Sequence, residues 1–283
     1  MLRTAYTPDI STTVPVSARV APVIFGLRDL AGAADRGELR LVYQPLARLS
    51  SGKTIGYEAL LRWDHPELGT VMPTDFIEDA EESGEIVALG EWVMRQACKE
   101  AALWDSRLFV SVNVSPVQIE TAGFVDMVVD ALAESGLNPV RLEIEVTETA
   151  LVRNGALTSL VLRQLRNMGV RIALDDFGAG HASFAYLLNF PFDNIKVDRQ
   201  FVSGIAHRPE SRAIVEAVAS LAHKLGMEVL AEGIEDVDQL IGAKLAGCEL
   251  GQGHLLGEPR AAADHYQLRR SAPTSAAPRA VAA

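Results

Sequence analysis

The sequence predicts an α/β protein folded as a (β/α)₈ barrel, similar to a TIM barrel, in which the first strand runs antiparallel. Short runs of β-forming residues alternate with amphipathic helical stretches, a pattern that is typical of a parallel sheet. Eight such runs are the number that closes a (β/α)₈ barrel. The runs span residues 39–44, 54–61, 108–114, 141–146, 170–174, 194–197, 228–231 and 248–251. An open, doubly wound sheet is the alternative architecture.

The first two runs are joined differently from the rest. Only residues 45–53 separate them, with a Ser51-Gly52 turn, and this link is too short for the crossover helix that parallel strands need. We therefore expect these two strands to form an antiparallel hairpin.

Two later stretches show the i, i+3, i+4 spacing of a helix face that packs on a sheet. One stretch carries Leu157, Leu160, Val161, Leu165 and Met168, and the other carries Ile214, Val215, Val218, Leu221 and Leu225.

The composition of the chain suggests three segments. Residues 1–35 mix Thr, Ser, Pro and Ala, and predict a partly ordered N-terminal arm with one helix over residues 21–34. Residues 271–283 are rich in Ala and Pro and lack bulky apolar side chains, so we expect a disordered tail. The working domain is expected to span residues 36–270.

The charge of the chain excludes several classes of partner. The 283 residues include 26 Lys and Arg and 37 Asp and Glu, for a net charge of -11. This balance argues against a nucleic-acid polymer or a membrane surface as the partner. Cys98 and Cys248 lie in apolar segments and indicate reduced, buried thiols. With no export signal and no apolar stretch long enough to span a bilayer, we expect a cytoplasmic protein.

Polar side chains recur at the ends of the predicted strands. Each one alone has an ordinary explanation, such as a helix cap or a solvent-facing position. In a (β/α)₈ barrel, however, the carboxyl ends of the strands meet on one face, where enzymes of this architecture work. The residues are Glu58, Arg62, Asn113, Glu145, Glu148, Asp175, Asp176, Lys196, Asp198, Glu232, Glu235 and Gln252.

The balance of charge among these residues indicates a metal site. Clustered carboxylates raise one another's pKa values, and one lysine with one arginine is too little positive charge to neutralise them. Carboxylate oxygens with an amide carbonyl suit hard divalent cations, so the set favours Mg²⁺ or Mn²⁺. The adjacent Asp175 and Asp176 could each face a different ion, with Asp175 the better candidate to bridge two.

Several of these residues lie in motifs that resemble those of the EAL-domain family, the bacterial cyclic di-GMP phosphodiesterases. The resemblance covers residues 36–262, and its motifs occur in the family's order. They are Tyr43-Gln44-Pro45, Glu58-Ala59-Leu60-Leu61-Arg62, Asn113-Val114-Ser115-Pro116, Glu145-Val146-Thr147-Glu148, Asp175-Asp176-Phe177-Gly178, Lys196-Val197-Asp198, Glu232-Gly233-Ile234-Glu235 and Gln252-Gly253.

The resemblance implies hydrolysis of cyclic di-GMP to linear pGpG with two Mg²⁺ or Mn²⁺ ions. It assigns the metal ligands as Glu58, Asn113, Glu145, Asp175, Asp176 and Glu232. Glu58, Glu232 and Lys196 would be catalytic, with Lys196 positioning or deprotonating the attacking water. Arg62 would contact a substrate phosphate, and Gln44, Asp198, Glu235 and Gln252 would line or support the nucleotide pocket. Glu148 would brace the loop that follows Asp176.

The resemblance also implies partners. Members of this family often dimerise through helices near the loop after the Asp pair, so we expect a homodimer, and a regulatory protein partner is possible. The chain departs from the usual pattern at Ala179, His181-Ala182, His254 and Gly257-Glu258. These departures concern the loop and guanine contacts, and none is a metal ligand. His254 is expected to replace a packing tyrosine, with a titrating role as the alternative.

Two other functions compete with hydrolysis. A non-catalytic receptor would bind cyclic di-GMP and act through a partner protein, but such relatives typically lose metal ligands that this chain keeps. A metal-dependent lyase or isomerase acting on a carboxylate substrate is compatible with Lys196 and the acidic residues. The eight ordered motifs argue against that second alternative.

Overall fold

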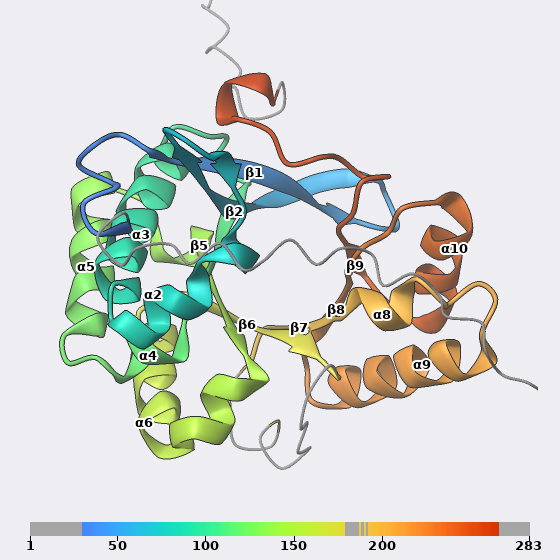
Figure 1. Ribbon diagram of the computed structural model, residues 1–283. Helices are drawn as coiled ribbons and strands as arrows, with labels where there is room; N and C mark the ends of the chain where they lie inside the picture. Colours follow the sequence, from blue (N-terminus) through green and yellow to red (C-terminus); the bar gives the residue numbers. More distant parts are fainter. Residues whose placement is uncertain (1–29, 179–186, 188–189, 191, 266–283) are drawn as a thin grey trace, which may run out of the picture.

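A closed barrel organises the part of the chain that the computed structural model describes, which is residues 30–178, 187, 190 and 192–265 (Figure 1). Neighbouring strands follow the order β1-β9-β8-β7-β6-β5-β4-β2, and β1 pairs again with β2 to close the ring. The short β3 extends the sheet beside β2. The strands are β1 (Leu39–Arg48), β2 (Lys53–His65), β3 (Gly69–Val71), β4 (Phe109–Asn113), β5 (Leu142–Thr147), β6 (Arg171–Phe177), β7 (Asn194–Val197), β8 (Glu228–Ala231) and β9 (Leu250–Gly251).

The first strand runs against the others, as the short link predicts. β1 is antiparallel to both β2 and β9, whereas the neighbours from β2 through β4 to β9 are parallel. The hairpin turns at Gly52, whose φ of 67° lies in the left-handed region that glycine adopts without strain. In this register Gln44 lies opposite Glu58. The predicted barrel with an antiparallel first strand is confirmed.

Helices cover the outside of the barrel (Figure 1). They pack there because each presents apolar residues to the strands, as α3 does with Leu89, Val93 and Met94. The helices are α2 (Ile77–Ser83), α3 (Ile86–Ala102), α4 (Pro116–Glu120), α5 (Phe124–Ser135), α6 (Glu148–Asn167), α8 (Arg199–Val202), α9 (Pro209–Lys224) and α10 (Val237–Ala246), with 3₁₀ turns η1 (Pro73–Asp75), η2 (Pro139–Arg141) and η3 (Ala262–Asp264).

The interior of the barrel changes from apolar to charged along its axis. Alternate residues of a strand point to opposite faces, so the apolar residues of β5 join the core beneath the helices while Glu143 and Glu145 point inward. A separate apolar cluster fills another part of the interior. Its buried members are Leu46, Phe109, Leu230 and Leu250.

The structure corrects several predicted boundaries. β1 and β2 extend beyond the predicted residues 39–44 and 54–61, and the added β3 pairs with the extension of β2. β9 has two residues in place of the predicted four. β6 continues through Phe177, so the Asp pair lies inside a strand and not after it.

Three predicted apolar positions are exposed. Leu160 is 55% exposed and Ile214 is 40% exposed, because the buried faces of α6 and α9 centre on other residues, such as Val161 and Val215. Leu225, directly after α9, is 37% exposed. The predicted helix over residues 21–34 lies largely outside the described residues, and residues 31–37 form turns. The predicted tail over residues 271–283 also lies outside them.

Candidate active site

Lys196 on β7 lies at the centre of the polar side chains that the barrel brings together. It is buried, and its Nζ atom contacts carboxylate oxygens of Glu145 at 2.8 Å, Glu232 at 2.8 Å and Asp175 at 3.0 Å. A Glu58 oxygen lies 3.9 Å away. Burial by itself would lower the pKa of Lys196, but the surrounding carboxylates raise it well above its usual value. Lys196 is therefore an ammonium ion and neutralises part of the acidic cluster.

Glu58 on β2 is held by two side-chain amides. Asn113 Nδ2 donates to Glu58 Oε1 at 2.6 Å, and Gln252 Nε2 donates to Glu58 Oε2 at 2.5 Å. The same Gln252 nitrogen lies 2.9 Å from Gln44 Oε1. Burial favours the neutral form of Glu58, but Lys196 and the two amides outweigh it and lower the pKa of Glu58. Side chains from β4, from β7 and from the residue that follows β9 thus fix the position of one carboxylate.

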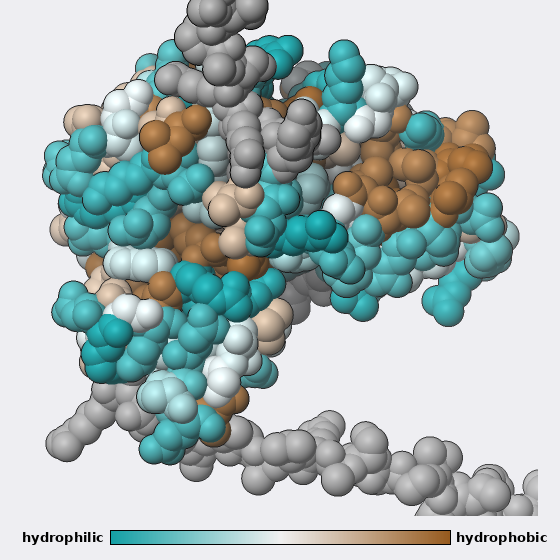
Figure 2. Space-filling model, turned by 90° about the horizontal axis from the view of Figure 1, so that it is seen from above, coloured by the Kyte–Doolittle hydropathy of each residue, from teal (hydrophilic) through white to brown (hydrophobic). Residues whose placement is uncertain are grey.

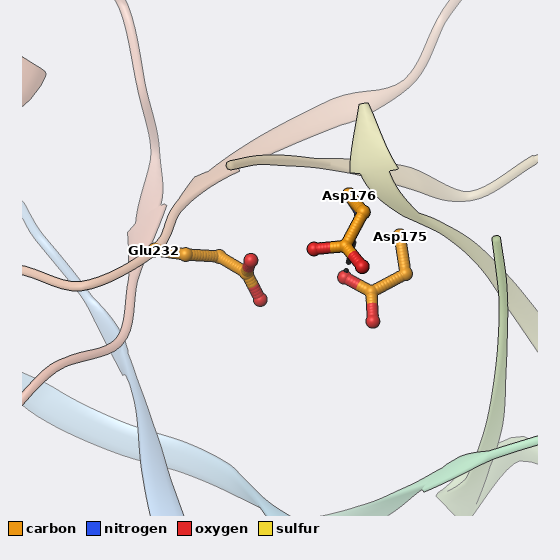
Figure 3. Close-up of side chains that lie close together, drawn as sticks. All are labelled: Asp175, Asp176 and Glu232. Atoms are coloured by element: carbon orange, nitrogen blue, oxygen red, sulfur yellow. Dashed lines mark hydrogen bonds between the residues drawn. The ribbon is translucent and has the colours of Figure 1, made fainter. Parts of the chain in front are cut away.

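Asp175, Asp176 and Glu232 form a compact carboxylate cluster. One oxygen from each lies within 4.8 Å of the others, and Figure 3 shows the pair from β6 facing Glu232. Adjacent residues of a regular strand point to opposite faces, so a regular β6 would separate the two aspartates. The pairing of β6 shifts between Leu174 and Phe177, and Asp176 has a φ of 55°. This bulge brings both carboxylates to one side.

The cluster holds more negative charge than Lys196 can neutralise. Burial first, and then repulsion by Asp175, raises the pKa of Asp176 to about 6. Burial also raises the pKa of Glu232 to about 8, against the opposing pull of Lys196. The pKa of Glu145 is raised well above its usual value, by burial and by Glu58. Clustered oxygen donors with an excess of negative charge fit hard divalent cations.

A cavity of about 260 Å³ opens beside this cluster. Several of the residues predicted to bind metal share its wall with the residues predicted to bind the substrate, except Arg62. The lining residues are Gln44, Glu58, Asp176, Asp198, Arg199, Glu232, Gly233, Glu235, Gln252, Gly253 and His254.

Arg62 and Glu148 lie at the edge of this arrangement. Arg62 is four residues beyond Glu58 on the same side of β2, is absent from the described lining of the cavity, and donates from Nη1 to the carbonyl of Leu61 at 2.7 Å. Glu148 begins α6, and its Oε1 accepts a hydrogen bond from the backbone N–H of Gly178 at 2.8 Å. Glu148 therefore contacts the segment that directly follows the Asp pair.

The sequence reasoning missed a second polar layer inside the barrel. Ser111 Oγ lies 2.7 Å from Glu145 Oε1 and 3.2 Å from Glu143 Oε1, and Asn194 Nδ2 donates to Glu143 Oε2 at 2.7 Å. Arg171 lies 3.2 Å from Glu143. A signal was present in the sequence, because Ser111, Glu143 and Asn194 each precede a predicted site residue by two positions and so share its strand face.

The EAL domain family model matches residues 27–259 of this chain. The chain belongs to the EAL domain family. No helix within residues 30–178 and 192–265 is long and apolar enough to cross a membrane.

EAL-domain relatives include proteins named for cyclic di-GMP turnover. MucR of Pseudomonas aeruginosa, named a bifunctional diguanylate cyclase/cyclic di-GMP phosphodiesterase, is 41% identical over 237 residues, covering 82% of this chain and 35% of MucR. PA2567 of the same organism, named a cyclic di-GMP phosphodiesterase, is 38% identical over 222 residues, covering 77% of this chain and 38% of PA2567. The chain thus spans about a third of the length of these relatives.

Solved EAL structures agree with the barrel. The MucR phosphodiesterase in its c-di-GMP complex matches with a TM-score of 0.80 and 41% identity, covering 84% of this chain and 98% of that one. The EAL enzyme Bd1971, with cAMP and cyclic-di-GMP bound, matches with a TM-score of 0.80 and 32% identity, covering 83% of this chain and 66% of that one.

The departures from the usual EAL pattern fall in different places. His254 is exposed and lines the cavity, whereas Ala179, His181 and Ala182 lie outside the described residues. The Gly257 carbonyl accepts from Gln44 Nε2 at 3.3 Å, and a Cβ atom there would lie 2.6 Å from Cγ of Pro45. Glycine at this position therefore allows the close approach. Glu258 pairs with Arg260 at 3.3 Å, away from the acidic cluster.

Proposed function

We propose that this chain hydrolyses one phosphodiester bond of cyclic di-GMP, giving linear pGpG and lowering the level of this second messenger. The observation that carries the proposal is the convergence of four buried or partly buried carboxyl groups on one ammonium group, with the exposed Asp176 close to two of them and a cavity alongside. The names of the relatives MucR and PA2567 supply the substrate class.

The acidic residues fit a pair of divalent ions, and we assign them as the ligands. Asn113 uses Nδ2 for Glu58, which leaves its Oδ1 as a further oxygen donor. Two bound Mg²⁺ or Mn²⁺ ions would neutralise the developing phosphate charge and lower the pKa of an attacking water. The ligands are Glu58, Asn113, Glu145, Asp175, Asp176 and Glu232.

Lys196 acts in this proposal by position and charge. An ammonium group donates hydrogen bonds and accepts none, so Lys196 can orient a water molecule or a phosphate oxygen. Lys196 is expected either to position the attacking water or to deprotonate it. The surrounding carboxylates raise the pKa of Lys196 and keep it protonated, and a protonated amine can position the water but cannot deprotonate it. Its contacts with Glu145, Asp175 and Glu232 also hold these three groups in place without metal.

The polar wall of the cavity would bind the nucleotide. Gln252 donates hydrogen bonds to both Gln44, in the wall of the cavity, and Glu58, a proposed metal ligand. The substrate-binding wall and the metal site are therefore in direct contact. Asp198 and Glu235, which also line the cavity, offer acceptors for guanine N–H groups. Arg62 would reach a phosphate by a change of side-chain rotamer from its contact with Leu61.

Incubation of the purified protein with cyclic di-GMP and either Mg²⁺ or Mn²⁺, with the products separated by chromatography, tests the proposal. We expect linear pGpG to appear only when metal is added, and Glu58→Ala to abolish its formation. Glu82→Ala, which removes an exposed carboxylate on α2, is the matched control and should keep full activity. Binding of cyclic di-GMP without turnover would instead indicate the receptor function.

A further inference from the structure

A second cavity, of about 400 Å³, lies at the end of the barrel opposite the carboxylate site. It opens where α6 ends and where β6 and β7 begin, whereas the Asp pair lies near the carboxyl end of β6. Its volume is within the usual range for small-molecule sites, about 300 to 1,000 Å³. Figure 2 shows apolar side chains gathered on the side of the molecule where α10 lies, but this cavity is lined mainly by charged and polar side chains. The wall includes Arg163, Arg166, Asn167, Gly169, Arg171 and Asp193.

The turn after α6 brings three arginines to this cavity. Arg163 and Arg166 are three residues apart, so both side chains leave the same face of α6. Gly169 then turns the chain toward β6 with a φ of 97°, and a Cβ atom there would lie 3.3 Å from Cγ1 of Val140. Arg171 follows as the first residue of β6. The end of one helix and the start of the next strand thus place three guanidinium groups in one wall.

The wall of this cavity carries an excess of positive charge. Asp193 is the one carboxylate among the described wall residues, and its Oδ1 lies 3.2 Å from Nη2 of Arg166. The carbonyl end of α6 adds roughly half a negative charge. The three guanidinium groups therefore leave more than one positive charge in the wall, in a chain whose net charge is -11.

The acidic groups behind the wall do not cancel this excess. Nη2 of Arg171 lies 3.2 Å from Glu143 and 4.0 Å from Glu228, and Glu228 pairs with Arg48 at 3.0 Å. With these groups included, the described region holds four guanidinium groups and three carboxylates. A guanidinium group has five N–H donors, so Arg166 and Arg171 can bind a further anion through Nε and Nη1 while Nη2 keeps its carboxylate.

We propose that this cavity binds a phosphate group. Planar guanidinium groups match the oxygens of a phosphate in pairs of charge-assisted hydrogen bonds. A phosphate dianion offers several oxygens and two charges to three guanidinium groups, whereas a carboxylate offers two oxygens and one charge. The amide of Asn167 can donate to a further oxygen. The volume also leaves room for an organic group, so the phosphate can be free or the phosphomonoester of a small molecule such as a mononucleotide.

The contacts of Arg171 decide which residues can test this proposal. Arg171 lies beside Glu143, and Ser111 joins Glu143 to Glu145 in the layer beneath the carboxylate site. Replacing Arg171 would therefore disturb the inside of the barrel as well as the cavity. Arg163 and Arg166 lie on the exposed surface of α6, so their replacement changes the cavity and leaves that layer intact.

Amide NMR spectra of the isotope-labelled full chain measure the binding. The protein is titrated in EDTA with inorganic phosphate or with GMP, from about 0.01 to about 10 mM, at constant ionic strength set with NaCl. Gly169 reports on this cavity, and Gly253 reports on the cavity beside the acidic cluster. With phosphate, we expect a saturable shift of the Gly169 resonance and none of the Gly253 resonance. At Gly169, a lower Kd for GMP than for phosphate would identify an organic phosphate as the preferred ligand, and an equal or higher Kd would identify the phosphate ion.

Variants of the wall should change this affinity in both directions. Arg166→Ala should weaken phosphate binding about tenfold and Arg163→Ala/Arg166→Ala about a hundredfold, because each arginine contributes charge-assisted hydrogen bonds. Asp193→Asn removes the carboxylate of the wall and should tighten binding about threefold. Arg62→Ala, in the proposed substrate site, and Arg107→Ala, whose side chain is 86% exposed, are the matched controls and should leave the affinity unchanged. Circular dichroism of each variant shows that it is folded.

Three results would overturn the proposal. The Gly169 resonance could stay in place over the whole range, or move equally with NaCl alone, which leaves the arginines only their pairing with Asp193 and Glu143. The Gly253 resonance alone could move, which places the phosphate beside the acidic cluster. The Kd could be unchanged in Arg163→Ala/Arg166→Ala, which places the phosphate at another site. Because EDTA removes divalent metal, none of these results depends on the proposed hydrolysis.

Discussion

Replacing Lys196 by methionine would remove the ammonium group at the centre of the site while keeping a side chain of similar length. Nζ lies within 3.0 Å of oxygens from Glu145, Asp175 and Glu232, and the side chain is buried. Removing one partner of a buried ion pair costs about 3 to 5 kcal/mol. We apply this cost once and not for each of the three contacts. Glu145 and Glu232 have raised pKa values, so they take up protons when the ammonium group is lost and do not remain as unpaired buried charges.

This cost converts into a measurable shift in the melting temperature. In a domain of this size, about 1 kcal/mol lowers Tm by roughly 2 to 4 °C. The metal-free Lys196→Met protein should therefore unfold about 6 to 20 °C below the wild type. Saturating Mg²⁺ should narrow this gap, because the cations neutralise the same carboxylates that Lys196 neutralises in their absence.

Thermal unfolding followed by circular dichroism, in EDTA and in Mg²⁺, measures both effects. Lys224→Met removes an exposed lysine at the end of α9 and is the matched control, with no expected change in either condition. A gap below about 2 °C in EDTA would refute the assignment of Lys196 as the counter-ion of the cluster. A gap that Mg²⁺ leaves unchanged would refute the shared role of lysine and metal.

Three further predictions concern protons and metal affinity. In EDTA the free energy of unfolding should fall as pH rises from about 4 to about 8, because Asp176 and Glu232 bind protons more tightly when folded, and a rise in urea-unfolding experiments would contradict this. Ser111→Ala removes the hydroxyl beside Glu145 and should weaken Mg²⁺ binding about tenfold by calorimetry, whereas an equal Kd would remove Ser111 from the support of the site. Glu148→Ala should speed hydrogen exchange at the Gly178 amide and weaken Mg²⁺ binding to a similar degree, and unchanged values of both would show that this contact has no effect on the site.

The barrel and the central part of the site could be predicted from the sequence because both follow from the two-residue period of strands. Glu58, Glu145 and Lys196 share the inner face of the barrel once the strand positions are known. The short link after β1 likewise determines the antiparallel hairpin, since no crossover helix fits there.

Other features depend on tertiary structure and could not be predicted in this way. The orientation of Asp176 requires a bulge in β6, and an isolated sequence shows neither the register shift nor the positive φ. The polar layer of Ser111 and Glu143 follows the same strand period. A buried carboxyl group is unfavourable without partners, however, and the sequence does not show that Ser111 and Arg171 lie beside Glu143. The exposure of Leu160 depends on which face of α6 meets its neighbours.

The two polar layers give the carboxylate site unequal support on its two sides. From within the barrel, Glu145 is held by Ser111, and the adjoining Glu143 is held by Asn194 and Arg171. These contacts come from strands, which keep ligand positions fixed more precisely than loops do. On the side of the cavity, Glu148 accepts a hydrogen bond from the backbone N–H of Gly178, in the segment that directly follows the Asp pair. We expect a signal that alters metal binding to act through this contact more readily than through the strand-supported barrel interior.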